Sequence, residues 1–182
     1  MAKSSNPVDH WRSREREVMK HAVLGRRLEV FESYAHRDEK LREELDKHLA
    51  ALKRSDLIET WCDRRISPGS EFASEIDAHL TTADIVLLLI SPDFLNSDYC
   101  YRREMGIALD RHAAGANRVI PIILRPVDWL PTPLGRLLAL PKDGKPITTW
   151  NRRDDALFDA AKGIRRVAEE LGYQRRLGQM TW

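Results

Sequence analysis

The chain has 182 residues, of which 42% are hydrophobic and 32% are charged, so it is long enough for one domain with a full core and too short for two of usual size. Its longest apolar run covers only residues 85–90 and its N-terminus has no hydrophobic stretch, so neither a membrane span nor secretion is indicated and we expect a cytosolic protein. The net charge is +2, and residues 1–27 carry seven Lys/Arg against three Asp/Glu. The remainder has a net charge of about −2, which argues against direct binding of nucleic acid by the globular part.

The two cysteines are Cys62 and Cys100. They lie far apart in the sequence, with no further cysteine and no histidine pair nearby, which is neither a disulfide framework nor a zinc pattern. We therefore expect two reduced structural thiols and no metal site.

The chain is expected to divide into a basic N-terminal extension (residues 1–27), one domain (residues 28–171) and a C-terminal tail (residues 172–182). Within the extension, apolar residues from Val8 to Leu24 lie partly on one helical face. Such a helix could dock on a partner or a second copy, but we favour a loosely attached extension.

Two strand–helix units open the domain. Leu28–Ser33 is predicted to be a short strand, followed by a helix from Arg37 to Leu52 whose leucines recur at helical spacing. Leu57–Asp63 is the second predicted strand. A loop from Arg64 to Gly69 then leads into a helix from Glu71 to Leu80.

The stretch at residues 83–105, ADIVLLLISPDFLNSDYCYRREM, is the one from which we predict a site. Ile85–Ile90 are six consecutive apolar residues, which indicates a strand buried on both faces of a parallel sheet. A crossover helix must follow, and residues 96–98 offer side chains that can cap it. Cys100 and Glu104 then lie four apart on one flank of this helix, beside the crevice where open α/β sheets bind ligands. Spacing alone does not distinguish Glu104 from a solvated helix glutamate.

The C-terminal third supplies the remaining elements. Arg118–Leu124 is predicted to be the fourth strand, and Pro121 within it lacks a backbone N–H, so its outer neighbour should be short. Ile147–Thr149 fits such a brief fifth strand. A helix from Asp154 to Leu171, apolar along one face, closes the domain.

Strands that alternate with helices predict an α/β fold with a doubly wound parallel sheet and helices on both faces. For this length we expect five strands in the flavodoxin-like order 2-1-3-4-5. The order reverses between strands 1 and 3, so the loops Tyr34–Arg37 and Pro92–Ser97 should face each other across one crevice. Glu104 and the loop from Arg64 to Gly69 should lie close to it.

Four segments resemble motifs of the Toll/interleukin-1 receptor (TIR) domain in its bacterial form. Val30–Lys40 resembles the first box, Asp63–Phe72 the mobile loop, Ser91–Met105 the active-site helix, and Arg118–Trp129 the fourth strand with its following loop. The resemblance covers about residues 28–170, and four motifs in the right order are far more specific than any one of them.

The resemblance implies either an enzyme or a scaffold, since the family contains both. Its enzymatic members cleave the bond between nicotinamide and ribose in NAD+, to give ADP-ribose or a cyclic variant, with one glutamate that matches Glu104. NAD+ is then the substrate and no cofactor is needed. Bacterial members act widely in antiphage defence and are activated by self-association, or by a further activating protein.

The resemblance also implies substrate-binding positions, which fall in three of the motifs: Tyr34, His36, Asp63, Arg64, Gly69, Cys100 and Tyr101. Tyr34 and His36 match a loop that faces substrate phosphates or nicotinamide, although Tyr34 fits the core and His36 a helix start equally well. Gly69 is better explained by backbone conformation than by contact. Three arginines could bind pyrophosphate as bidentate donors, although exposed arginines are more often solvated: Arg64, Arg65 and Arg125.

Two positions depart from the family pattern. Many active relatives have an aromatic residue four positions before the glutamate, where this chain has Cys100, so stacking on a ring of the dinucleotide would have to come from Tyr99 or Tyr101. Glu32 stands where relatives usually carry an aliphatic residue. A carboxylate in a central strand is costly unless it reaches the crevice or an arginine.

The sequence is compatible with two functions and argues against a third. The leading hypothesis is an NAD+ glycohydrolase activated by self-assembly, in which the mobile loop of one copy completes the site of the next. The second is a non-catalytic scaffold that signals through homotypic TIR–TIR contacts. A phosphate-accepting receiver domain of similar topology is excluded because Ser91, and not an aspartate, follows the third strand and no acidic pair follows the first.

Overall fold

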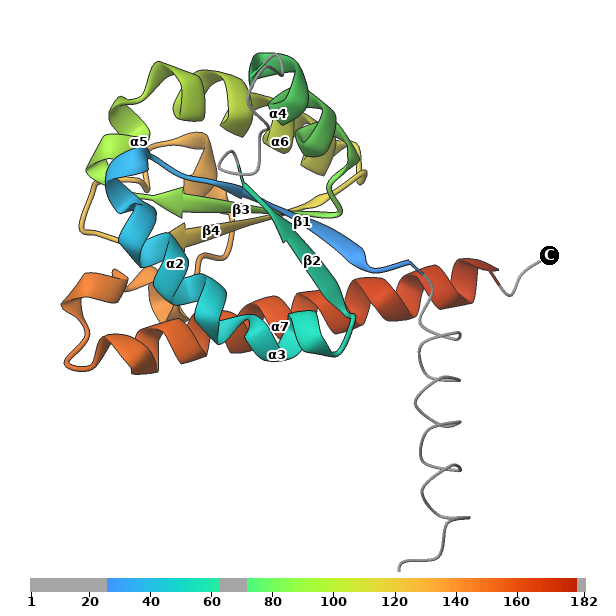
Figure 1. The fold of residues 1–182 in the computed structure, drawn as a ribbon. Coiled ribbons are helices and arrows are strands. Elements are labelled where there is room, and N and C mark those ends of the chain that lie inside the picture. Colours follow the sequence, from blue (N-terminus) through green and yellow to red (C-terminus); the bar gives the residue numbers. More distant parts are fainter. Residues whose placement is uncertain (1–25, 63–71, 180–182) are drawn as a thin grey trace, which may run out of the picture.

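A computed structural model of the chain describes residues 26–62 and 72–179 (Figure 1). Two predicted features, the helix from Val8 to Leu24 and the loop from Arg64 to Gly69, lie outside the described residues. The part of the chain that is described forms an α/β fold with one parallel sheet, as the sequence predicts.

The sheet has four parallel strands in the order β2-β1-β3-β4. Their bounds are Leu28–Ser33 for β1, Ile58–Trp61 for β2, Ile85–Ile90 for β3 and Arg118–Ile123 for β4. β2 is shorter than predicted and pairs with β1 only as far as Phe31 and Trp61. The end of β1 therefore extends past β2, and this end carries the residues of the predicted crevice.

The central strand β3 separates two apolar cores. All six of its residues are buried, because helices cover both faces and no polar alternation is needed. Ile85, Leu87 and Leu89 belong to one core and the intervening residues to the other. The strand that the sequence marks as buried on both sides is thus the middle of the domain.

Three helices cover each face of the sheet (Figure 1). On one face lie α2 (Glu39–His48), α3 (Ala50–Arg54) and α7 (Arg153–Gln179). On the other face lie α4 (Phe72–Thr82), α5 (Pro92–Asn96) and α6 (Met105–Ala113). The predicted leucine stripe of the first helix is buried as Leu41, Leu45, Leu49 and Leu52, although a short 3₁₀ turn precedes α2 and the chain bends at Leu49.

The prediction of a fifth strand at Ile147–Thr149 is wrong, because this segment forms a 3₁₀ turn. Thr148 N still donates to Leu124 O at the end of β4 (3.1 Å), but Thr149 N bonds back to Pro146 O (2.9 Å). The segment reaches the predicted place without forming a ladder, so the sheet of the described residues has four strands.

The outer edge of β4 is closed by other groups, which explains why no strand pairs there. Leu140 N donates to Pro121 O (2.8 Å), and Ile123 N donates to Leu140 O (2.8 Å). Val119 N donates to His112 Nδ1 (3.3 Å). Since Pro121 has no N–H, these contacts use two donors of this edge, Val119 N and Ile123 N, and one acceptor, Pro121 O. A single bridging residue, Leu140, replaces the expected strand.

The segment after β3 is more broken than predicted. Ser91 caps α5 directly, since its Oγ accepts from Phe94 N (3.1 Å) and Pro92 occupies the first turn. A wider π-helical turn, η3 (Tyr99–Glu104), then leads into α6. The predicted helix, capped by residues 96–98, thus begins with a π turn and continues as α6, and the short helix α5 before it was not predicted. Such π turns are rare and often found at functional sites.

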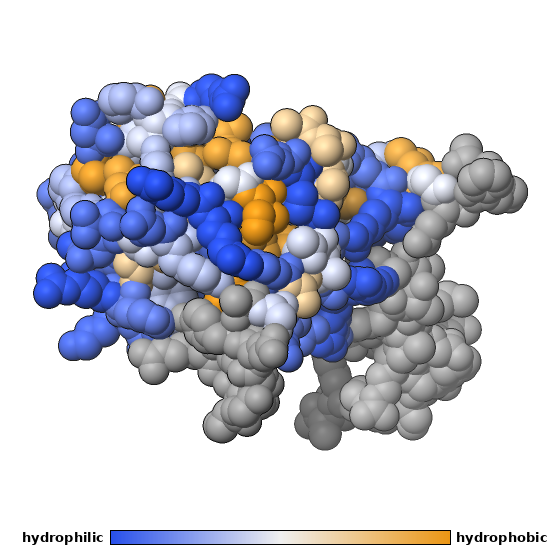
Figure 2. All heavy atoms as spheres, turned by 90° about the horizontal axis from the view of Figure 1, so that it is seen from above, coloured by the Kyte–Doolittle hydropathy of each residue, from blue (hydrophilic) through white to orange (hydrophobic). Residues whose placement is uncertain are grey.

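The last helix is longer than predicted, since α7 continues past Leu171 to Gln179. Its apolar stripe ends where predicted, and Tyr173 and Leu177 beyond it are exposed. The outer surface over α4 to α6 is mostly hydrophilic with small apolar areas (Figure 2). Within the described residues, no helix combines the length and the apolar character needed to cross a membrane.

Candidate active site

A cleft of about 430 Å³ lies at the carboxyl end of β1, between the chain that follows β1 and the chain that follows β3. This is the point where the strand order reverses, as predicted for open α/β sheets. The loop after β1 contributes Tyr34, His36 and Arg37, and the segment after β3 contributes Asp93, Ser97, Tyr99, Cys100 and Glu104.

Glu104 lies in this cleft and is not a solvated helix residue. It is only 5% exposed, at the last position of η3. The Oγ of Ser33, the last residue of β1, donates a short hydrogen bond to Glu104 Oε2. The alternation of β1 places Ser33 on the same face as Phe31, which is the face covered by η3. The strand therefore orients the carboxylate.

Cys100 fills the space where an aromatic residue was expected. It is buried, and its Sγ lies 3.5 Å from Tyr34 O, in the geometry of a weak hydrogen bond to the end of β1. A thiol in this place packs the π turn against β1 but offers no ring for stacking. Stacking on a substrate ring cannot come from this position.

On the η3 wall of the cleft, the aromatic ring belongs to Tyr99, not to Tyr101. Tyr101 packs against the core on the α4 and α6 side, whereas Tyr99 lines the cleft. Burial, and to a smaller extent the negative charge of Glu104, raise the pKa of the Tyr99 hydroxyl. From the sequence alone, either tyrosine could face the cleft. The π turn decides between them, because it changes which positions of the helix point toward the cleft.

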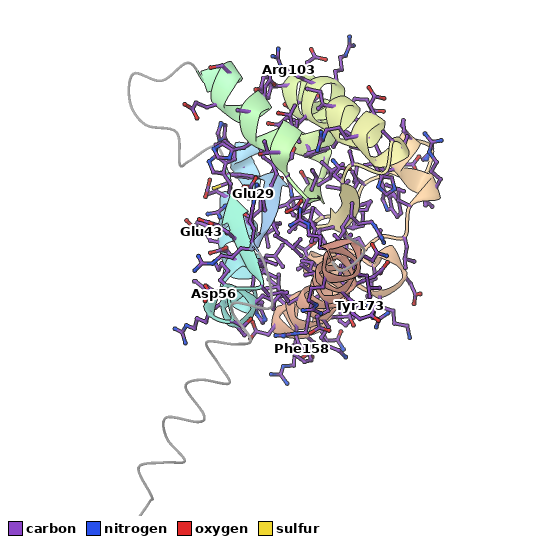
Figure 3. All side chains as sticks on the ribbon, turned by 90° about the vertical axis from the view of Figure 1, so that its right-hand side faces the viewer. Glu29, Glu43, Asp56, Arg103, Phe158 and Tyr173 are labelled. Atoms are coloured by element: carbon purple, nitrogen blue, oxygen red, sulfur yellow. The ribbon has the colours of Figure 1, made fainter. Side chains whose placement is uncertain are left out.

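A neighbouring ion pair positions Tyr99. The Arg103 guanidinium lies over the Tyr99 ring, 6.0 Å from its centroid, and Arg103 Nε donates to Asp77 Oδ1 of α4 (3.2 Å). Arg103 lies on the upper layer of helices (Figure 3). The contact joins α4 to η3, so the tyrosine is held from the side away from the cleft.

Tyr34 and His36 lie where the sequence places them, on the opposite wall. The Tyr34 hydroxyl donates to Glu39 Oε2 (2.7 Å), and the Arg42 guanidinium lies 5.5 Å from the ring centroid. The His36 ring meets the Tyr34 ring edge-on, with centroids 6.3 Å apart. Tyr34 is thus both a core residue and a cleft residue. Three other predicted positions lie outside the described residues: Asp63, Arg64 and Gly69.

Arg37 and Asp93 are cleft residues that the sequence analysis did not select. The Arg37 side chain is 83% exposed, and its Nε lies 3.8 Å from Asp93 Oδ1. Both positions lie within segments that resemble family motifs, but nothing in their spacing marks them as binding residues. The structure places a cation at the mouth of the cleft.

Glu32 reaches an arginine, which resolves its predicted cost in part. It is 2% exposed, and Arg42 Nη1 donates to its Oε2 (3.3 Å). Its Oε1 has no hydrogen-bond partner among the described residues. Burial, with a smaller contribution from the charge of Asp46, raises the pKa of Glu32 from 4.5 to about 7 despite the opposing effect of Arg42.

Arg125, which the sequence offered as a possible pyrophosphate ligand, binds two carboxylates of the protein instead. Its Nε donates to Asp38 Oδ1 (2.8 Å) and its Nη2 donates to Asp93 Oδ2. Arg125 does not line the cleft itself. The structure thus assigns it to the support of the cleft and not to its surface.

Comparison with known proteins agrees with the resemblance. Residues 30–160 match the model of the TIR domain family. A protein of Sinorhizobium fredii (strain NBRC 101917 / NGR234), uncharacterized protein y4lF, is 53% identical over 139 residues, which are 76% of this chain and 43% of that protein. The chain thus spans less than half the length of that relative.

A solved structure also matches, the TIR domain of the Toll-related receptor TRR-2 from Hydra magnipapillata. The match is 28% identical, has a TM-score of 0.47 and covers 61% of this chain and 81% of that one. Since the family model matches well over half of the residues, the chain belongs to the TIR domain family.

Proposed function

We propose that this TIR domain is an NAD+ glycohydrolase in which Glu104 is the catalytic carboxylate. The observation that supports this most is the position of Glu104, which is buried but lines an open cleft at the switch point of the sheet. A buried carboxylate costs free energy unless it is hydrogen-bonded or paired, and polar groups that converge on a cleft mark it as a candidate binding or active site.

The reaction requires only one carboxylate. In NAD+ the nicotinamide is a pyridinium cation, so when the bond to ribose breaks, its electron pair goes to the ring nitrogen and nicotinamide leaves as a neutral molecule. No general acid is needed, unlike the hydrolysis of ordinary glycosides. The positive charge passes to the ribose, and Glu104 stabilises this cation by its negative charge.

The second half of the reaction forms the product. A water oxygen bonds to the ribose carbon and releases its proton, which gives ADP-ribose. A nucleophile of the substrate itself in place of water gives a cyclic variant. Ser33 keeps the carboxylate of Glu104 oriented through both steps, because it donates to one oxygen from the end of a buried strand.

The walls of the cleft fit the rest of a dinucleotide. Tyr99 offers a ring for stacking on one side. On the other side, Arg37 and His36 supply groups that can meet phosphate oxygens. Residues 63–71 of a neighbouring copy complete the site in an assembly, which makes turnover dependent on self-association. Antiphage defence by depletion of NAD+, or by a nucleotide messenger, is the corresponding biological role.

The test follows nicotinamide by chromatography after concentrated protein is incubated with NAD+, with and without a crowding agent that promotes assembly. We expect release by the wild type and its loss in Glu104→Gln, which keeps the shape of the side chain and the contact to Ser33. If both proteins release equal amounts, or neither does under assembly conditions, the proposal is wrong and the scaffold function is favoured.

A further inference from the structure

One buried carboxylate joins the carboxyl ends of three neighbouring strands. Asp38, which follows β1, is 2% exposed. It accepts from the Oγ of Ser91 at the end of β3 and from Nε of Arg125 at the end of β4. Both of these side-chain hydrogen bonds come from residues that follow other strands, so Asp38 fixes the loop after β1 relative to the rest of the sheet.

Arg125 extends this contact to the other wall of the cleft. While Nε donates to Asp38, Nη2 donates to Asp93 in the first turn of α5. The guanidinium is planar and holds two carboxylates in a fixed relation, which a lysine ammonium cannot do. Hydrogen bonds to Asp93 and Asp38 raise the pKa of Arg125, and the bond from Arg125 lowers the pKa of Asp93. Both shifts have the direction expected for ion pairs, in which each partner favours the charged form of the other.

The two carboxylates belong to opposite walls. Asp38 ends the short turn that carries His36 and Arg37, and Asp93 begins the helix that leads to Ser97. Four of these side chains line the cleft: His36, Arg37, Asp93 and Ser97. Because both walls are attached to one guanidinium, their separation depends on Arg125.

Arg125 also determines the charge at the mouth of the cleft. Asp93 lies between Arg125 and Arg37, and the contact with Arg37 is the longer one, at 3.8 Å. Without Arg125, the Asp93 carboxylate would be left to pair with Arg37, and the cation that faces the cleft would be neutralised. An anionic dinucleotide would then meet less positive charge.

We propose that Arg125 is a positioning residue that sets the spacing and charge of the two cleft walls and thereby the affinity for the dinucleotide. The predicted effect on affinity rests on the proposed function, because that function names the substrate. The attachment of both cleft walls to Arg125 does not depend on it. It predicts an effect on binding without direct contact between Arg125 and the substrate.

The test uses the full chain with two variants that differ in their effect on the buried aspartate. Asp93→Asn removes only the charge on the cleft side and leaves the contact between Arg125 and Asp38. Arg125→Lys keeps the positive charge but cannot hold both carboxylates. We expect Arg125→Lys to raise KM for NAD+ about ten-fold with kcat nearly unchanged, the sign of lost binding shared by ground and transition states. Asp93→Asn removes the negative charge beside Arg37, so by the same charge argument it should lower KM.

The matched control is Arg118→Met. Arg118 lies at the opposite end of β4, has a similar exposure and pairs with Glu170 of α7 (3.1 Å). It should leave KM unchanged. Wild-type KM in Arg125→Lys, a KM in Asp93→Asn that is not below the wild-type value, or a loss confined to kcat would overturn the proposal.

Amide hydrogen exchange without nucleotide separates this inference from the proposed function. Arg125→Lys should exchange faster than the wild type at residues 35–38 and 92–97, with α7 unchanged, because both walls lose a common attachment. If the wild type releases no nicotinamide, the proposed function fails, and hydrogen exchange alone decides whether Arg125 holds the two walls. Unchanged exchange at both segments would then show that Arg125 does not hold the walls.

Discussion

Ser33 donates a hydrogen bond to Glu104, and so the last residue of the first strand holds the side chain proposed to be catalytic. The two residues are 71 positions apart in the sequence. A charge-assisted hydrogen bond of this kind restricts the carboxylate to one orientation at the floor of the cleft.

Glu104→Gln should reduce the rate of nicotinamide release about 100-fold or more, because the amide carries no charge to stabilise the ribose cation. The measurement is the initial rate at saturating NAD+. Ser33→Ala should reduce kcat about ten-fold, since it leaves the charge but removes its orientation. A larger loss in Ser33→Ala than in Glu104→Gln would contradict the assignment of roles.

Tyr99→Ala should raise KM for NAD+ about ten-fold, because the η3 wall of the cleft loses its ring, whereas Tyr99→Phe should keep the wild-type value. Tyr173→Ala is the matched control. Tyr173 is also a tyrosine under an arginine, with Arg176 6.0 Å from its ring centroid, but it lies on α7 (Figure 3). An equal rise in the Tyr173 variant would show that the effect is not local.

Because of Glu32, the free energy of unfolding should fall as the pH rises from about 4.5 to about 7. Its pKa is raised in the folded state, so the folded protein binds the proton more tightly than the unfolded chain in this range. The contribution of Glu32 to the free energy of unfolding is therefore greatest below pH 4.5. It falls by about 3 kcal/mol as the pH rises to about 7.

Glu32→Gln and Glu32→Ile should both raise the free energy of unfolding at pH 8 and flatten its dependence on pH. Arg42 keeps its contact with Glu39 (Nη2 to Oε1, 2.8 Å) in either variant. Urea unfolding at pH 5 and pH 8 is the measurement. Lower stability of both variants at pH 8 would instead show that the pair of Glu32 with Arg42 is net stabilising.

Ser91→Ala should lower the free energy of unfolding by about 2 kcal/mol, because Ser91 both caps α5 and donates to the buried Asp38. Thr132→Ala provides the comparison. Its hydroxyl caps a 3₁₀ turn by accepting from Leu134 N (3.3 Å) and lies away from the cleft. A cost no larger than that of Thr132→Ala would mean that the contact with Asp38 adds nothing.

The sequence predicted the parts of this fold that depend on local pattern. Six apolar residues marked β3, and leucines at helical spacing marked the buried face of α2 and α3. The position of Glu104 followed from topology, since the helix after a central strand must begin at the crevice. These inferences need no knowledge of which distant side chains meet.

The features that were missed depend on contacts between distant residues. A π turn in place of an α-helix exchanged Tyr101 for Tyr99 at the cleft, and no propensity marks such a turn. The sequence left Arg125 as either a possible pyrophosphate ligand or a solvated residue, because its actual partners, Asp38 and Asp93, come from two other loops. The fifth strand was expected from Pro121, but the backbone of Leu140 had already taken that edge.

The closure of the β4 edge gives the domain one inaccessible flank. Any additional strand contributed by another chain would have to join the sheet at β2, on the opposite side. The sheet could therefore be extended at one edge only. Two copies that paired through β2 would leave no open edge for a third.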